Sequence, residues 1–284
     1  MPEVAGQLDS NPGAWERMRT MQSTLANLWQ RRHLLRMLVS SNLKRQNKNT
    51  VLGYLWWLLD PMLMTAVYYV LVAVLFKRHD KDSPYVFFLM VGLLSWKAFS
   101  DSLAQSVLVF KGQAPLVRSI GFPKVVLPLS IVLSNGIYFM IALLVAFGLG
   151  LAYGPSWGTW PSLYYLLLPI PIIIQLVMAA GFSLIVCTLG VFFHDTANIL
   201  NHILRMWFFL TPVLYPLTRV PTKLLPVFRL NPFSEILPIY RDIIIHGRMP
   251  LLSDILYSAA AALVVGVFGY LFFRRYEGRL VQRL

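Results

Sequence analysis

The run VVLPLSIVLSNGIYFMIALLVAFGLGLAYGPSWGTWPSLYYLLLPIPIIIQLVMAAGFSLIVCTLGVFF, residues 125–193, contains no Lys, Arg, Asp or Glu. One helix needs only about 20 residues to cross the hydrocarbon core of a bilayer, so this run is too long for a single span. Gly, Pro, Ser and Trp gather near its centre, in YGPSWGTWPS at 153–162, which is typical of a turn at a membrane surface. The run therefore predicts two membrane-spanning helices joined by a turn.

The composition of the whole chain also indicates a protein that is surrounded by lipid. Of 284 residues, 57% are hydrophobic and 13% are charged, whereas a soluble domain of this size needs a charged shell. Soluble enzymes and nucleic-acid-binding modules are therefore excluded. The net charge of +13 is explained by anionic lipid headgroups and by retention of Lys and Arg on the cytoplasmic side. We predict an all-α membrane protein.

Applied to the rest of the chain, the same reasoning predicts six transmembrane helices, at 60–76, 84–110, 125–152, 164–193, 196–215 and 254–273. Six spans place both termini on one side. Cytoplasmic termini leave about twice as many Lys and Arg inside as outside, which favours that orientation. The chain then divides into a cytoplasmic N-terminal region (1–59), a six-span domain (60–273) and a basic cytoplasmic tail (274–284).

Two segments outside the spans have patterns of their own. Before the first span, apolar residues recur at helical spacing and predict an amphipathic interface helix in the headgroup plane. The residues assigned to it are Leu28, Trp29, Arg32, Leu35 and Arg36, of which the arginines interrupt the apolar stripe. The Pro-rich stretch 215–250 predicts either re-entrant helices between spans five and six or an ordered external loop.

Few residues of the chain could carry chemistry. Lys97 and Asp101 stand four apart within the second span, so they can pair on one helix face, and a structural ion pair is favoured over a substrate contact. Arg205 lies within the fifth span, and its partner cannot be named from the sequence. Cys187 is the single cysteine, the five histidines show no metal-ligand spacing, and the phosphate-loop motif G-x-x-x-x-G-K-[ST] is absent. We therefore expect no catalytic residue and no metal site.

Several stretches occur together in a fixed order. LKRQNKNTVLGYLWWLLDPMLM (43–64) is followed by VGLLSWKAFSDSLAQSV and LVRSIGFPKVVLPL between 91 and 129, and then by FFHDTANIL, FFLTPVLYP and LNPFSEILPIYRDII between 192 and 244. In this order the chain resembles the membrane subunits of ABC exporters that move lipid-linked polysaccharides, the O-antigen, teichoic-acid and capsule exporters. That family commonly has Arg-Asp where this chain has His194–Asp195, so no salt bridge is carried over to that corner.

The resemblance implies how such a chain would work. It implies a homodimeric channel in the bacterial cytoplasmic membrane, seated on two copies of a separate ABC ATPase that binds ATP and Mg. This chain would then be a transport subunit, with no cofactor of its own and no nucleic-acid partner. The resemblance further implies that segment 111–123 is a helix that couples the channel to the ATPase. The coupling residues would be Gly112, Pro115, Leu116, Val117, Arg118, Ile120, Phe122 and Pro123.

A channel for sugar polymers explains the abundance of aromatic residues. Aromatic rings stack on the weakly apolar C–H faces of sugars, and many shallow sites let a polymer slip past. Candidate channel residues are Trp96, Phe99, Tyr138, Trp207, Phe208 and Tyr215, and a candidate exit gate is Asn231, Pro232 and Phe233. Core packing or lipid contact is the alternative role for each of these aromatic rings.

Two other functions stay open from the sequence. One is a drug or lipid exporter of the same permease superfamily, which would lack a continuous aromatic track. The other is an integral membrane enzyme acting on a polyprenyl or phospholipid headgroup. Such an enzyme would need clustered carboxylates or a His/Asp site at one membrane face.

Overall fold

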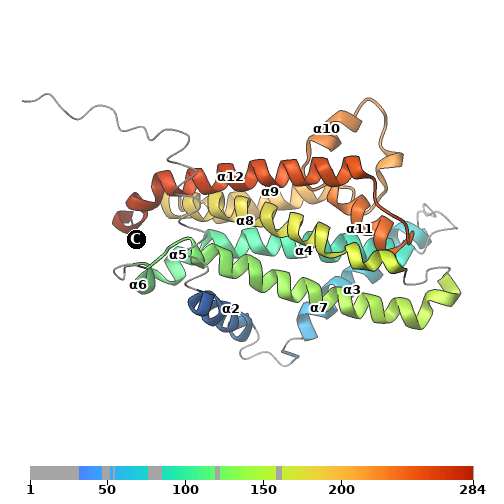
Figure 1. The fold of residues 1–284 in the computed structure, drawn as a ribbon, viewed down its shortest axis with the longest axis horizontal. Coiled ribbons are helices and arrows are strands. Elements are labelled where there is room, and N and C mark those ends of the chain that lie inside the picture. Colours follow the sequence, from blue (N-terminus) through green and yellow to red (C-terminus); the bar gives the residue numbers. More distant parts are fainter. Residues whose placement is uncertain are drawn as a thin grey trace, which may run out of the picture.

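The computed structural model describes residues 32–46, 52–53, 55–75, 85–118, 122–157 and 162–283. Within these ranges the chain is helical and contains no strand. Four helical segments are long and apolar enough to cross a membrane. They are α4 (Tyr85–Val107), α7 (Val126–Trp157), η2 with α8 (Leu163–Leu167 and Pro169–Phe192) and α12 (Leu252–Arg283). They run side by side along the long axis of the molecule (Figure 1), which confirms the predicted all-α membrane class.

The other two predicted spans form shorter helices. The first is α3 (Leu55–Tyr69), which continues without a break as the π-helix η1 (Val70–Leu75). The second is α9 (Thr196–Leu210), whose helix ends five residues before the predicted limit at 215. Both run along the four longer helices (Figure 1), but neither reaches the length and apolarity of a full span by itself.

Two helices extend past the ends predicted for them. The predicted turn at 153–162 begins too early, because α7 remains helical as far as Trp157. The predicted tail 274–284 is helical and continues α12 as far as Arg283. Beyond the apolar part of α12 the helix becomes amphipathic: Phe273 and Leu280 are fully buried, whereas Arg274 is exposed. One buried stripe is therefore enough to extend the helix past the membrane-spanning length.

The predicted interface helix is observed in part, as α2 (Arg32–Gln46). Leu28 and Trp29 lie outside the described residues, Arg32 and Arg36 are exposed, and Leu35 is half-buried. The helix packs against α7, with the Asn42 amide donating to Ser130 Oγ at 3.0 Å. The two interrupting arginines therefore point away from the apolar contact, as long cationic side chains near headgroups do.

The Pro-rich stretch folds into short helices at the opposite end of the bundle from α2 (Figure 1). Helix α10 (Leu225–Leu230) projects from the bundle, whereas α11 (Ile236–Ile244) is packed against α4, α8 and α12. The guanidinium of Arg241 is buried there, donating from Nη2 to the Val213 carbonyl at 2.9 Å and lying 3.4 Å from the Phe88 ring centroid. This end of the bundle is therefore capped by ordered structure.

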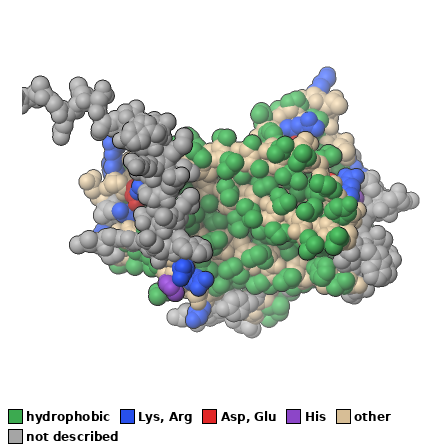
Figure 2. All heavy atoms as spheres, in the orientation of Figure 1, with side chains coloured by type: hydrophobic (Ala, Val, Ile, Leu, Met, Phe, Trp, Pro, Cys, Tyr) green, Lys and Arg blue, Asp and Glu red, His purple; other side chains and the backbone are tan. Residues whose placement is uncertain are grey.

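The surface matches a protein surrounded by lipid. Figure 2 shows hydrophobic side chains across the middle of one face, with Lys and Arg gathered toward the two ends. Helix α12 contributes strongly to the exposed apolar surface, for example through Leu263, Val264 and Phe268, which are each about 60% exposed or more. Such a band would be a liability in water and is expected in a bilayer.

Candidate functional site: a polar cavity between α3, α4 and α9

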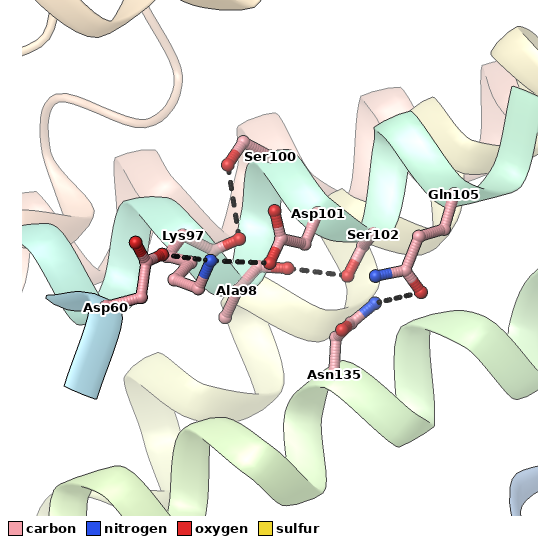
Figure 3. A network of polar contacts seen from close by, with 8 residues as sticks. All are labelled: Asp60, Lys97, Ala98, Ser100, Asp101, Ser102, Gln105 and Asn135. Atoms are coloured by element: carbon pink, nitrogen blue, oxygen red, sulfur yellow. Dashed lines mark hydrogen bonds and ion pairs between the residues drawn. The ribbon is translucent and has the colours of Figure 1, made fainter. Parts of the chain in front are cut away.

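Three charged side chains meet between α3 and α4. Lys97 Nζ lies 2.7 Å from Asp60 Oδ2 and 3.2 Å from Asp101 Oδ2 (Figure 3). The pair within α4 is the one that the i, i+4 spacing predicted. Asp60 comes from α3 and was not assigned to this cluster from the sequence. The Lys97 ammonium therefore links α4 to α3 through Asp60, and it also pairs with Asp101 one turn further along α4.

The cluster belongs to a polar stripe on α4. Lys97, Asp101 and Gln105 follow one another at intervals of four residues and so share one helix face. Gln105 accepts a hydrogen bond from the Asn135 amide of α7 at 3.4 Å (Figure 3). The stripe thus runs along α4 from the charged cluster toward α7, within a segment otherwise dominated by apolar residues.

The charges are only partly shielded by the protein. The exposed fractions are 25% for the Lys97 side chain, 49% for Asp60 and 30% for Asp101. Ionised groups at membrane depth are costly unless they face protein or a water-filled space. Because these three are open on one side, that side must face water or another protein surface instead of lipid.

The open side is a cavity of about 560 Å³ between α3, α4 and α9. Asp60, Lys97 and Asp101 line it from one side, and Asn201 and Arg205 line it from α9. Two carboxylates and two cationic groups therefore share one space, so its formal charge is balanced. The sequence named no partner for Arg205, and the structure places it in the same cavity as Lys97, Asp60 and Asp101.

Helix α9 carries a polar face that the monomer leaves open. Asn198, Asn201, His202 and Arg205 are exposed and recur every three or four residues, while Leu200 and Leu204 are buried against the bundle. A helix that runs among apolar spans and exposes amides, an imidazole and a guanidinium is unsuited to lipid. The polar faces of α4 and α9 meet at the same cavity, which makes it the candidate site.

The predicted channel aromatics fall into separate environments. Trp96 and Phe208 line the cavity. Phe99 and Phe233 are fully buried, with ring centroids 4.7 Å apart, and Phe99 lies 5.4 Å from Trp207. Phe99 and Phe233 therefore pack in the core of this chain, which is the alternative role that the sequence left open.

The remaining two channel candidates lie away from the cavity. Tyr138 is buried on α7, and its hydroxyl donates to the Leu43 carbonyl of α2 at 3.1 Å. Tyr215 follows α9, and its hydroxyl donates to the Phe209 carbonyl at 2.7 Å. Both hydroxyls therefore hold neighbouring segments together in this conformation, and neither ring lines the cavity.

The predicted exit-gate residues connect the Pro-rich stretch to α9. Asn231 Oδ1 accepts from Trp207 Nε1 at 2.9 Å and from the Phe233 backbone N–H at 3.0 Å, and its amide donates to Thr211 Oγ1 at 2.8 Å. Pro232 is half-buried beside it. These bonds tie the end of α9 to the segment that leads into α11.

The predicted coupling segment forms two short helices, α5 (Val109–Gly112) and α6 (Ala114–Val117). They lie at the end of the bundle that carries the C-terminus of α12 (Figure 1). Pro115 lies in the first turn of α6, where proline is well tolerated. Val117 is 1% exposed, so its side chain packs inside this chain. Leu116 is half-buried, Arg118 is exposed, Phe122 and Pro123 are half-buried, and Ile120 lies outside the described residues.

A bundle of long apolar helices with a polar cavity between them defines a multi-pass membrane protein. Residues 33–245 match the family described as ABC-2 type transporter. Because this match covers most of the chain, the chain belongs to the ABC-2 type transporter family. The family resemblance seen in the sequence is thereby confirmed.

The similarity to curated relatives extends over most of this chain and over most of each relative. An O-antigen export system permease protein RfbA of Myxococcus xanthus is 33% identical over 240 residues, 84% of this chain and 90% of the relative. A protein of the same name from Klebsiella pneumoniae is 30% identical over 215 residues, 75% of this chain and 81% of that protein. A second Klebsiella pneumoniae protein of this name is 28% identical over 237 residues.

Proposed function

We propose that this chain is the membrane subunit of an ATP-driven exporter that moves a lipid-linked polysaccharide across the bacterial cytoplasmic membrane. The observation that carries the proposal is the open polar cavity between α3, α4 and α9, on a chain whose relatives are named O-antigen export permeases. A sugar polymer needs a wet, polar path, and charged groups at this depth need the same surroundings.

A second copy would complete the path. The polar face of α9 and the half-exposed Asp60 are unsuited to lipid, so a homodimer that brings two such faces together would enclose them. In this arrangement α3 with η1, together with α9 and the residues after it, supply the two shorter crossings. Six crossings then place both termini in the cytoplasm, in keeping with the position of α2 and the end of α12 at one end of the bundle (Figure 1).

Energy would come from two copies of a separate ABC ATPase, which bind ATP and Mg. Segment 109–118 would sit on the ATPase, because α5 and α6 lie at the same end of the bundle as the basic end of α12. Closure of the ATPase pair would push this segment and move α4 with it. The bonds from Asn231 to Trp207 and Thr211 would pass the movement of α9 to the outer cap, where the gate would open.

The proposed path is tested by thiol accessibility in the assembled complex with its ATPase. Asn201→Cys should react with a membrane-impermeant maleimide, because Asn201 lines the cavity. Val264→Cys, on the exposed apolar face of α12, is the matched control and should stay unlabelled within the bilayer. Labelling of Val264→Cys with no labelling of Asn201→Cys would contradict the proposed path.

Coupling is tested separately. Arg118→Glu combined with Leu116→Ser should reduce cargo-stimulated ATP hydrolysis while the complex still assembles. Arg219→Glu, at the opposite end of the bundle, is the control for the charge change. Hydrolysis that is unchanged in the Arg118 and Leu116 variant would remove segment 109–118 from the ATPase contact.

A further inference from the structure

A second cleft, which shares no lining residue with the polar cavity, lies between the ends of α8 and α12. Its volume is about 600 Å³. Phe192 and Phe193 line it from the end of α8, and Tyr276, Arg279 and Arg283 line it from α12. Because Arg279 and Arg283 line the cleft, it sits at the C-terminal end of α12, where the candidate membrane-spanning part of that helix ends.

Among the described residues, the charged side chains that line the cleft are both cationic. Arg279 and Arg283 are both exposed and stand four apart, so their like charges lie on one face of α12 and destabilise it slightly. The described residues that line the cleft include no carboxylate. The nearby Glu277 is already engaged, because its Oε2 lies 2.9 Å from Arg274 Nη1. An anion between the two guanidinium groups would therefore relieve the repulsion between Arg279 and Arg283.

An aromatic row leads from the cleft along α12. The Phe192 and Tyr276 rings are 5.7 Å apart, Tyr276 and Phe272 are 5.0 Å apart, and Phe272 and Phe268 are 6.2 Å apart. Phe268 is 59% exposed and lies deeper in the apolar band of the helix. The row offers a continuous apolar surface next to the cationic pair, which fits a molecule with a charged head and a hydrocarbon tail.

We propose that this cleft is a binding site for an anionic phospholipid. The phosphate would lie between Arg279 and Arg283, and one acyl chain would lie along Tyr276, Phe272 and Phe268. Basic clefts between transmembrane helices on the cytoplasmic side are suited to anionic headgroups, and the cationic pair supplies the charge complementarity. The site is separate from the polar cavity and does not depend on the identity of the exported cargo.

The test uses the full chain in detergent and counts bound lipid by native mass spectrometry. Dioleoyl phosphatidylglycerol should bind, and dioleoyl phosphatidylcholine should bind more weakly. Arg279→Ala and Arg283→Ala should each weaken phosphatidylglycerol binding about fivefold, the usual contribution of one basic residue at an anionic surface. Arg275→Ala removes the same charge from the same helix end, outside the cleft, and should leave binding unchanged.

A competitor without an acyl chain tests the role of the aromatic row. Millimolar sodium phosphate should not displace phosphatidylglycerol, because it lacks the hydrocarbon chain. Displacement by phosphate would overturn the assignment to a phospholipid, and an equal loss in Arg275→Ala would show general surface charge instead of a site. Arg283 is exposed in the last turn of α12, so Arg283→Ala keeps the test available even if Arg279→Ala fails to fold.

Discussion

Replacing Lys97 with Met isolates the charged cluster between α3 and α4. The substitution keeps much of the side-chain volume but removes the ammonium that lies 2.7 Å from Asp60 and 3.2 Å from Asp101. Two carboxylates would then share the cavity with Arg205 as the remaining cation, and neither would keep its direct ion pair with Lys97. We expect the folded state to be destabilised, because a charge left without its partner inside a protein is costly.

The size of the effect follows from the degree of shielding. Removing one partner of a fully buried ion pair costs about 3–5 kcal/mol. Here the three side chains are a quarter to a half exposed, which lowers the expected loss to about 2–3 kcal/mol. Neutralising all three groups, with Lys97→Met, Asp60→Asn and Asp101→Asn together, should recover most of that loss, since neither carboxylate is then left charged without the ammonium that pairs with it.

Thermal unfolding of the detergent-solubilised protein, followed by tryptophan fluorescence, provides the assay. Lys111→Met is the matched control, because Lys111 is an exposed lysine in α5 and its loss should change stability by less than about 0.5 kcal/mol. A Lys97→Met midpoint equal to that of Lys111→Met would refute the reasoning. So would a triple variant that unfolds below Lys97→Met.

Two further predictions concern other parts of the chain. A Cβ added at Gly181 would lie 2.5 Å from the Val265 backbone oxygen, so Gly181→Ala should force α8 and α12 apart and lower the unfolding midpoint. Gly148→Ala, with open space around it, should be neutral or slightly stabilising, and equal midpoints for the two variants would contradict the packing argument. Burial, followed by repulsion from Asp254, raises the pKa of Glu235 above its ordinary value of 4.5. The folded protein holds the proton of Glu235 more tightly than the unfolded chain does, so the free energy of unfolding should fall as pH rises from about 4.5 through the raised pKa. Glu235→Gln should remove that fall. Identical slopes of the unfolding midpoint against pH in the two proteins would count against Glu235 as its cause.

The fold was largely predictable where the chain offered a long contrast in polarity. The run 125–193 predicted α7 and α8 because an uncharged apolar segment of this length needs two crossings of a bilayer. The ends of helices were less predictable. Helix α12 passes the apolar limit at 273 because Leu280 still finds a buried position, and that contact depends on the neighbouring helices.

The site was predictable only within one helix. Lys97 and Asp101 were paired from their spacing, which is a local property of α4. Asp60 could not be added, because its meeting with Lys97 depends on how α3 sits beside α4. For aromatic residues such as Phe99, the polar stripe of α4 marks one face of the helix, but its other faces are apolar and give no sign of which of them packs inside. The spacing of Asn198, Asn201 and Arg205 was a signal for the polar face of α9 that the sequence reading did not use.

The central claim is that this chain forms the path of an ATP-driven polysaccharide exporter. Proteoliposomes containing the chain together with its ATPase, with the nucleotide sites outside, allow the transfer of a lipid-linked polysaccharide into the lumen to be measured by protection from an added glycosidase. The account predicts protection that requires this chain, the ATPase and hydrolysable ATP together. Protection that arises without the ATPase, or a complete complex that hydrolyses ATP in response to the polymer yet never protects it, would contradict the account.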